Sequence, residues 1–75
     1  MHNFKEGDSV RLLAGREADV IGESRKLRLP AGSLASVVLV YGDARNPEAY
    51  ELEAHVIEQD CYVLLTVVTS EVGPA

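Results

Sequence analysis

The segment from Ala49 to Thr69 constrains the fold of this chain more than any other part of it. In its first half, apolar and polar side chains alternate strictly: Tyr50, Leu52, Ala54 and Val56 against Glu51, Glu53 and His55. A period of two residues is typical of a half-buried β-strand. The second half, residues 61–68, is a continuous apolar run rich in β-branched residues, as in a strand covered on both faces. Only three polar residues separate the halves, so the segment predicts a β-hairpin in a small β-rich domain.

The length and composition favour one compact domain that spans residues 1–75, with loosely ordered ends at 1–6 and 73–75. The chain has 75 residues and is 47% hydrophobic, which is enough to form a core. Cys61 is the single cysteine, so no disulfide can form within the chain. The lone thiol and the absence of a signal-peptide pattern lead us to expect a cytoplasmic protein. No apolar stretch is long enough to cross a membrane.

Two further segments predict strands, one at Ser9–Ala14 and a stronger one at Ser33–Tyr41. Residues 15–28 have no sustained period, and we interpret them as a long loop between the first and second main strands, with Val20 and Ile21 tucked onto the core. Four or five antiparallel strands with few exposed edges predict a strongly bent, barrel-like sheet. The predicted core comprises Val10, Leu12, Leu34, Val38, Val40, Tyr50, Leu52, Val56, Val63, Leu65 and Val67.

Four blocks of the chain resemble a known family. They read G-D-S-V-R-L-L (residues 7–13), L-P-A-G-S-L-A-S-V-V-L-V-Y (29–41), A-Y-E-L-E-A (49–54) and Y-V-L-L-T-V (62–67). Their order and spacing are similar to those of the small bacterial family DUF4926. The resemblance covers about two-thirds of the chain and implies an all-β, SH3-like barrel. It implies no activity, because the family is functionally uncharacterised.

The residues offer little for catalysis or metal binding. His55 and Cys61 could form a catalytic pair only if the hairpin brought them together, but His55 belongs to the outer face and Cys61 is expected on the other side or in the core. Glu51, Glu53 and His55 line one strand face and could offer metal ligands, yet a solvated strand face has the same appearance. We therefore expect no enzyme, no catalytic or metal-binding residue, and no cofactor.

A basic group lies in the predicted loop and raises the possibility of anion or nucleic-acid binding. Its members are Arg16, Arg25, Lys26 and Arg28. SH3-like barrels include nucleic-acid readers, but this group lacks interleaved aromatic residues for base stacking. The net charge of −5 also opposes binding to phosphates. A nucleic-acid-binding barrel is therefore the alternative rather than the favoured interpretation.

The aliphatic residues outnumber what one barrel interior can hold. We place Val37, Leu39, Leu64 and Val68 on the side opposite the core, where they are either covered by loop 15–28 or buried by another protein. The strand face of Glu51 and Glu53 would then steer a basic partner. We expect a non-catalytic protein-interaction module that self-associates or binds a protein partner. Its small size and acidity suit an immunity or antitoxin-like inhibitor of a basic toxin.

Overall fold

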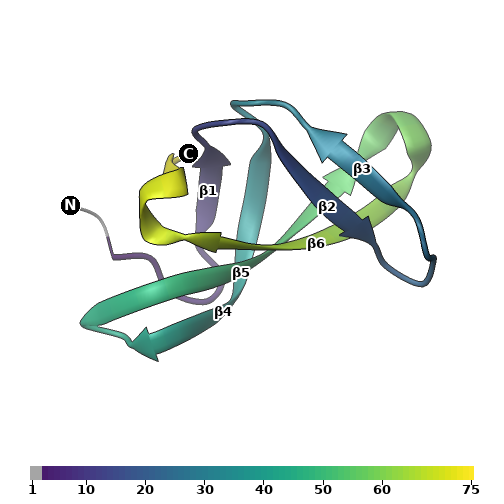
Figure 1. Cartoon of the computed structure of the whole chain (residues 1–75). Coiled ribbons are helices and arrows are strands. Elements are labelled where there is room, and N and C mark those ends of the chain that lie inside the picture. Colours follow the sequence, from purple (N-terminus) through teal and green to yellow (C-terminus); the bar gives the residue numbers. More distant parts are fainter. Residues whose placement is uncertain (1–2) are drawn as a thin grey trace.

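The computed structural model describes residues 3–75, so Met1 and His2 of the predicted loose N-terminal end lie outside the described part. Within that part the chain is all-β, with two short 3-10 helices and no α-helix. The strands are β1 (Ser9–Leu12), β2 (Arg16–Val20), β3 (Lys26–Leu29), β4 (Leu34–Asp43), β5 (Asn46–Val56), β6 (Cys61–Val68) and β7 (Val72–Pro74). The 3-10 helices η1 (Ile57–Gln59) and η2 (Thr69–Glu71) flank β6 (Figure 1).

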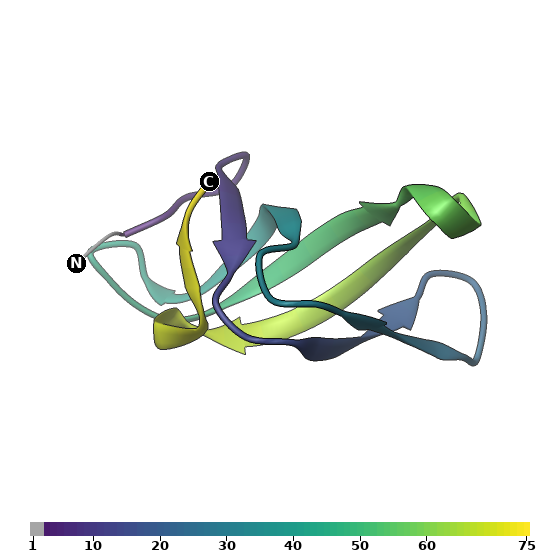
Figure 2. The same ribbon diagram turned by 90° about the horizontal axis from the view of Figure 1, so that it is seen from above.

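The strands form one antiparallel sheet in the order β3-β2-β6-β5-β4-β1-β7. The sheet curls on itself as a half-open barrel, so that β1 and β7 lie across one end and the β2–β3 hairpin lies across the other (Figures 1 and 2). The prediction of an all-β, antiparallel, barrel-like fold is confirmed. The predicted number of four to five strands was wrong, because three short strands at β2, β3 and β7 lack the long apolar runs that mark the others.

The hairpin predicted from the alternating segment is present. β5 and β6 pair in unbroken register from Ala49 opposite Val68 to Val56 opposite Cys61. The connection is η1, which ends at Asp60 with a left-handed backbone (φ 48°). Aspartate tolerates this conformation better than most residues, and it fills a position that often requires glycine.

The predicted loop 15–28 is a β-hairpin instead. β2 and β3 pair from Arg16 opposite Leu29 to Asp19 opposite Lys26, and β2 also pairs with β6. Ala18 and Val20 are buried, whereas Ile21, which we expected in the core, is exposed. The alternation was present in R-E-A-D-V and K-L-R-L, but Ala18 is a weak apolar marker and each strand is short.

The first half of β4, as far as Val37, faces the core with the opposite phase to the one predicted. Ala35 and Val37 are buried, while Leu34 and Val38 are exposed, so these two predicted core residues were wrong. An irregularity in the pairing with β5, between Val37 and Leu39, leaves Val38 as an extra residue in β4. A bulge of this kind turns two successive side chains to the exposed side.

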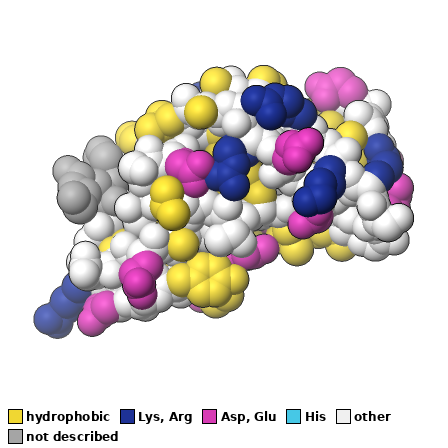
Figure 3. All heavy atoms as spheres, viewed as in Figure 1, with side chains coloured by type: hydrophobic (Ala, Val, Ile, Leu, Met, Phe, Trp, Pro, Cys, Tyr) yellow, Lys and Arg dark blue, Asp and Glu magenta, His cyan; other side chains and the backbone are white. Residues whose placement is uncertain are grey.

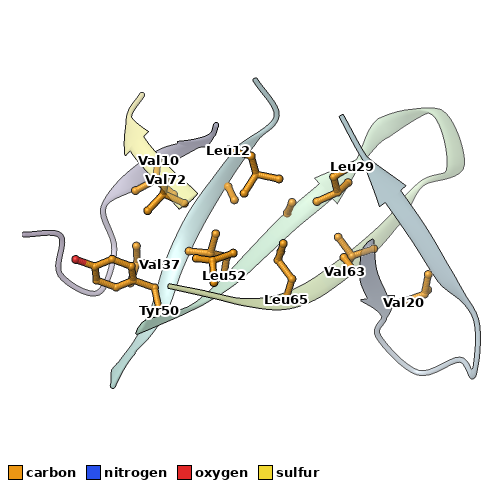
Figure 4. Packing of buried hydrophobic residues seen from close by; sticks show 14 residues of the cluster. Val10, Leu12, Val20, Leu29, Val37, Tyr50, Leu52, Val63, Leu65 and Val72 are labelled. Carbon is orange, nitrogen blue, oxygen red and sulfur yellow. The ribbon is translucent and has the colours of Figure 1, made fainter. Parts of the chain in front are cut away.

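The remaining core matches the prediction closely. Its buried residues converge from both ends of the curled sheet (Figure 4). The predicted residues that are buried are Val10, Leu12, Tyr50, Leu52, Val63, Leu65 and Val67. Val40 and Val56 pack against this cluster and are partly buried. Ala18, Val20, Leu29, Ala35, Val37, Ala54 and Val72 are the buried residues that the predicted core omitted.

Both ends of the described chain are held more firmly than predicted. Phe4 packs on the core, with its ring edge-on to Tyr50 at a centroid separation of 5.9 Å. At the other end Val72–Pro74 pairs with β1 as strand β7, and Gly73 is buried. The prediction of a loose tail at residues 73–75 was therefore wrong for Gly73 and Pro74.

Candidate functional site

A patch of exposed apolar residues covers the outer side of β4, β5 and β6. We define the outer patch as Val38, Leu39, Tyr41, Leu64 and Val68 together with the acidic residues Glu51 and Glu53. The strand register makes it continuous. One row across the sheet is Tyr41, Ala49 and Val68, and the next is Leu39, Glu51 and Thr66. Leu39, Tyr41 and Val68 are 42%, 40% and 52% exposed, so neighbouring strands present a shared apolar surface.

The carboxylate of Glu51 lies at the centre of the outer patch. Its Oε1 accepts hydrogen bonds from the Thr66 hydroxyl (2.7 Å) and from the Tyr41 hydroxyl (3.1 Å). The bond to Glu51 raises the pKa of Tyr41 above its usual value, because the neighbouring carboxylate disfavours a second negative charge. Within residues 3–75, neither Glu51 nor Glu53 forms an ion pair. The patch therefore combines aliphatic surface with uncompensated negative charge.

The structure corrects one of the predicted interface residues. Val37 is 1% exposed and belongs to the core, because β4 has the phase described above. Leu39, Leu64 and Val68 lie on the outer side as predicted, with Leu64 only partly exposed. Val38 and Tyr41 are additional members that the sequence reasoning missed. The hairpin β2–β3 does not cover the patch around Leu39, since β2 pairs with β6 only near Val63 and Leu64.

His55 and Cys61 do not meet. In the β5–β6 register His55 lies opposite Tyr62, and Cys61 lies opposite Val56. The His55 ring stacks on Tyr62 with centroids 4.6 Å apart, and its Nε2 lies 3.3 Å from Oδ1 of Asp60. Cys61 is half-buried against the core, on the other face of the sheet. Glu51, Glu53 and His55 share the outer face, but among residues 3–75 no group of three His, Cys, Asp or Glu side chains is placed to hold a metal ion.

Three of the four basic residues singled out in the sequence are paired with carboxylates. Arg16 binds Glu71, Arg25 binds Glu23 at 2.6 Å, and Lys26 lies 3.5 Å from Asp19. The hydrogen bond from Arg25 to Glu23 raises the pKa of the guanidinium. Arg28 is the exception and forms no ion pair within the described chain.

In Figure 3 most of the visible Lys and Arg side chains lie over the upper and right-hand parts, where Figure 1 shows β2 and β3. Hydrophobic side chains are visible along the lower side, below β5 and β6, and also along the upper left edge. Acidic side chains lie between these basic ones as well as along the lower side, in agreement with the ion pairs of Arg25 and Lys26.

Comparisons of the chain with protein-family models, with curated proteins and with solved structures find no match. No helix within residues 3–75 has the length and apolar character needed to cross a membrane.

Proposed function

We propose that this protein is a non-catalytic protein-interaction module whose outer patch binds a basic partner protein. One observation carries the proposal. On the outer side of the sheet, the cross-strand row that contains Leu39 and Glu51 lies next to the row that contains Tyr41 and Val68, so apolar and acidic side chains form one continuous surface. Monomeric proteins rarely leave contiguous apolar surface without a use. An apolar patch with charges in and around it is typical of an interface that other proteins cover.

Charge favours a foreign partner over a second copy of the chain. A symmetric dimer through the outer patch would bring Glu51 and Glu53 of both copies close together without a cation. A partner that presents Lys or Arg among apolar residues would instead pair with these carboxylates. An acidic inhibitor of a basic toxin, in the manner of an immunity protein or antitoxin, is a role that fits this chemistry.

The test compares two leucine substitutions on the immobilised protein. Leu39→Lys removes apolar surface and adds one positive charge to the outer patch, whereas Leu13→Lys makes the same change at an exposed leucine that follows β1. A basic protein that is captured by the wild type and by L13K, but not by L39K, would support the proposal. The captured protein, once purified, must also bind the purified wild-type protein. A captured protein that binds L39K equally well would contradict it.

Light scattering on a size-exclusion column, at low and at high salt, decides the role of a second copy. A monomer under both conditions agrees with a foreign partner. A dimer that persists at high salt and is abolished by L39K would assign the outer patch to self-association instead.

Nucleic-acid binding through Arg16, Arg25, Lys26 and Arg28 is the competing hypothesis. It has less support, because three of these cations are already neutralised by nearby carboxylates. Titration of labelled DNA and RNA at low salt tests it, and tight, salt-sensitive binding that is lost in an Arg28→Gln variant would favour it.

A further inference from the structure

A groove of about 550 Å³ lies where the half-open barrel fails to close. One wall is β3, from Leu27 to Leu29, and the opposite wall is the end of β5, from Ala54 to Val56, followed by η1. The volume falls within the range of about 300–1,000 Å³ that is usual for ligand sites. This groove is separate from the outer patch and does not depend on its proposed function.

Both walls carry backbone that no neighbouring strand uses. β3 is an edge strand, because it pairs with β2 alone. The pairing of β5 with β4 extends only as far as Ser36 opposite Glu53, so Ala54, His55 and Val56 pair with β6 alone. Unpaired strand edges present alternate N–H and C=O groups that an added strand can bind. An extended segment in the groove could therefore pair with β3 on one side and β5 on the other.

The groove is lined by apolar residues that suit alternate side chains of such a segment. Leu29 and Ala54 are buried, and Val56 is partly buried. At the rim Ile57 is 77% exposed and Leu34 is 56% exposed, more than most aliphatic residues of this chain. In an added strand every second side chain points to the same face, so aliphatic residues at alternate positions would cover this surface.

The charge of the groove is opposite to that of the whole chain. Arg11 and Arg28 both line it, and neither forms an ion pair within residues 3–75. Among the described residues, the guanidinium of Arg11 donates only to the Gly32 carbonyl, at 2.7 Å. Glu58 is the single carboxylate that lines the groove. On a protein with net charge −5, two uncompensated arginines at one groove indicate an acidic occupant.

We propose that this groove binds an extended acidic segment of another protein as an added β-strand. In the bound segment aliphatic residues alternate with Asp or Glu. The aliphatic side chains cover Leu29 and Val56, the carboxylates reach Arg11 and Arg28, and the backbone pairs with β3 and with the end of β5.

The experiment uses a synthetic peptide of about six residues, blocked at both ends, in which Glu alternates with Val. Binding to the full chain is followed by NMR, because backbone amide signals report which strands are touched. We expect saturable shifts of the amides of Leu27–Leu29 and Ala54–Val56, together with slower hydrogen exchange at those amides that pair with the peptide. A peptide with Lys in place of Glu should not bind.

Matched variants separate specific binding from general charge effects. Arg28→Gln should weaken binding of the Glu peptide about tenfold, as expected for loss of a charge-assisted hydrogen bond. Arg45→Gln removes the same charge from an arginine that lies in the β4–β5 turn and forms no ion pair with any described residue, and it should leave binding unchanged. Thermal unfolding of both variants confirms that they fold.

Three outcomes would overturn the proposal. They are absence of shifts at millimolar peptide, equal binding of the Lys peptide, and shifts confined to residues outside the groove. Because L39K changes the outer patch and not the groove, it should bind the Glu peptide like the wild type. Failure of this proposal and failure of the proposed function are thereby distinguished.

Discussion

The guanidinium of Arg16 at the start of β2 donates to the carboxylate of Glu71 in η2, although 55 positions of sequence separate them. Arg16 also donates to the carbonyl of Thr66 in β6, at 3.2 Å. Glu71 in turn accepts a hydrogen bond of 2.8 Å from the N–H of Val68. One ion pair thus joins the start of the β2–β3 hairpin to the turn that leads into β7.

This arrangement determines how Glu71 titrates. Burial alone would raise the pKa of Glu71, but the hydrogen bond from Val68 and the charge of Arg16 outweigh it, so the pKa is lowered. A lowered folded-state pKa means that the ionised form stabilises the fold. This contribution is complete above the ordinary glutamate pKa of about 4.3 and is lost as the pH falls through the folded-state pKa.

We predict that Glu71→Gln lowers the free energy of unfolding at pH 7 by about 0.5–1 kcal/mol, since both partners are partly exposed. Glutamine can still accept the bond from Val68 but cannot pair with the charge of Arg16. The difference from wild type should shrink in urea unfolding as the pH falls through the lowered folded-state pKa of Glu71, because protonation removes the charge that pairs with Arg16. A difference that stays constant with pH would show that the effect comes from packing.

The hydrogen bond between Phe4 and Tyr50 should also make a measurable contribution to the free energy of unfolding. The Tyr50 side chain is fully buried, and its hydroxyl accepts a hydrogen bond of 3.1 Å from the N–H of Phe4. Tyr50→Phe keeps the ring but removes the acceptor, so we expect a loss of about 0.5–1.5 kcal/mol and faster hydrogen exchange at Phe4. Tyr62→Phe is the control, because Tyr62 is half-exposed and its hydroxyl has no hydrogen bond within residues 3–75. Equal losses in the two variants would contradict the assignment.

The parts of the fold that could be predicted are those in which one strand face differs from the other. Tyr50 and Leu52 alternate with Glu51 and Glu53, so both the strand and its buried side followed from the sequence. The β6 bounds, Cys61–Val68, were predicted correctly because the apolar run is long and ends at polar residues. The alternation in β5 and the apolar run in β6 are local sequence patterns, and they predict a strand whichever strands pair with it in the sheet.

Other parts depend on the sheet as a whole. In β4 the run V-V-L-V is apolar at every position, so periodicity cannot show that Val37 is inside and Val38 outside. The Glu51 hydrogen bonds from Tyr41 and Thr66 require the register of three strands. The groove could not be predicted either, because it depends on sheet curvature that brings β3 opposite the end of β5.

Two glycines with positive φ, Gly32 in a turn and Gly42 near the end of β4, should respond differently to substitution. Gly32 (φ +88°) has open space where a Cβ would lie, whereas a Cβ on Gly42 (φ +90°) would come within 3.1 Å of the Glu48 backbone nitrogen. Gly32→Ala should cost about 1 kcal/mol, from the positive φ alone. Gly42→Ala should cost more, because the β4–β5 turn must also move. Thermal unfolding of both variants tests the order, and a larger loss for G32A would contradict it.

Two adjacent valines in β4 provide a matched pair that tests which side of the strand faces the core. Val37 is 1% exposed and packs among the core residues, while Val38 is 41% exposed on the outer side. Val37→Ala removes two buried methyl groups and leaves a cavity, so we expect a loss of about 2 kcal/mol in the free energy of unfolding. Val38→Ala should change it by less than about 0.5 kcal/mol. Urea unfolding monitored by circular dichroism measures both, and the reverse order would mean that β4 faces the core with Val38, which would also remove Val38 from the outer patch.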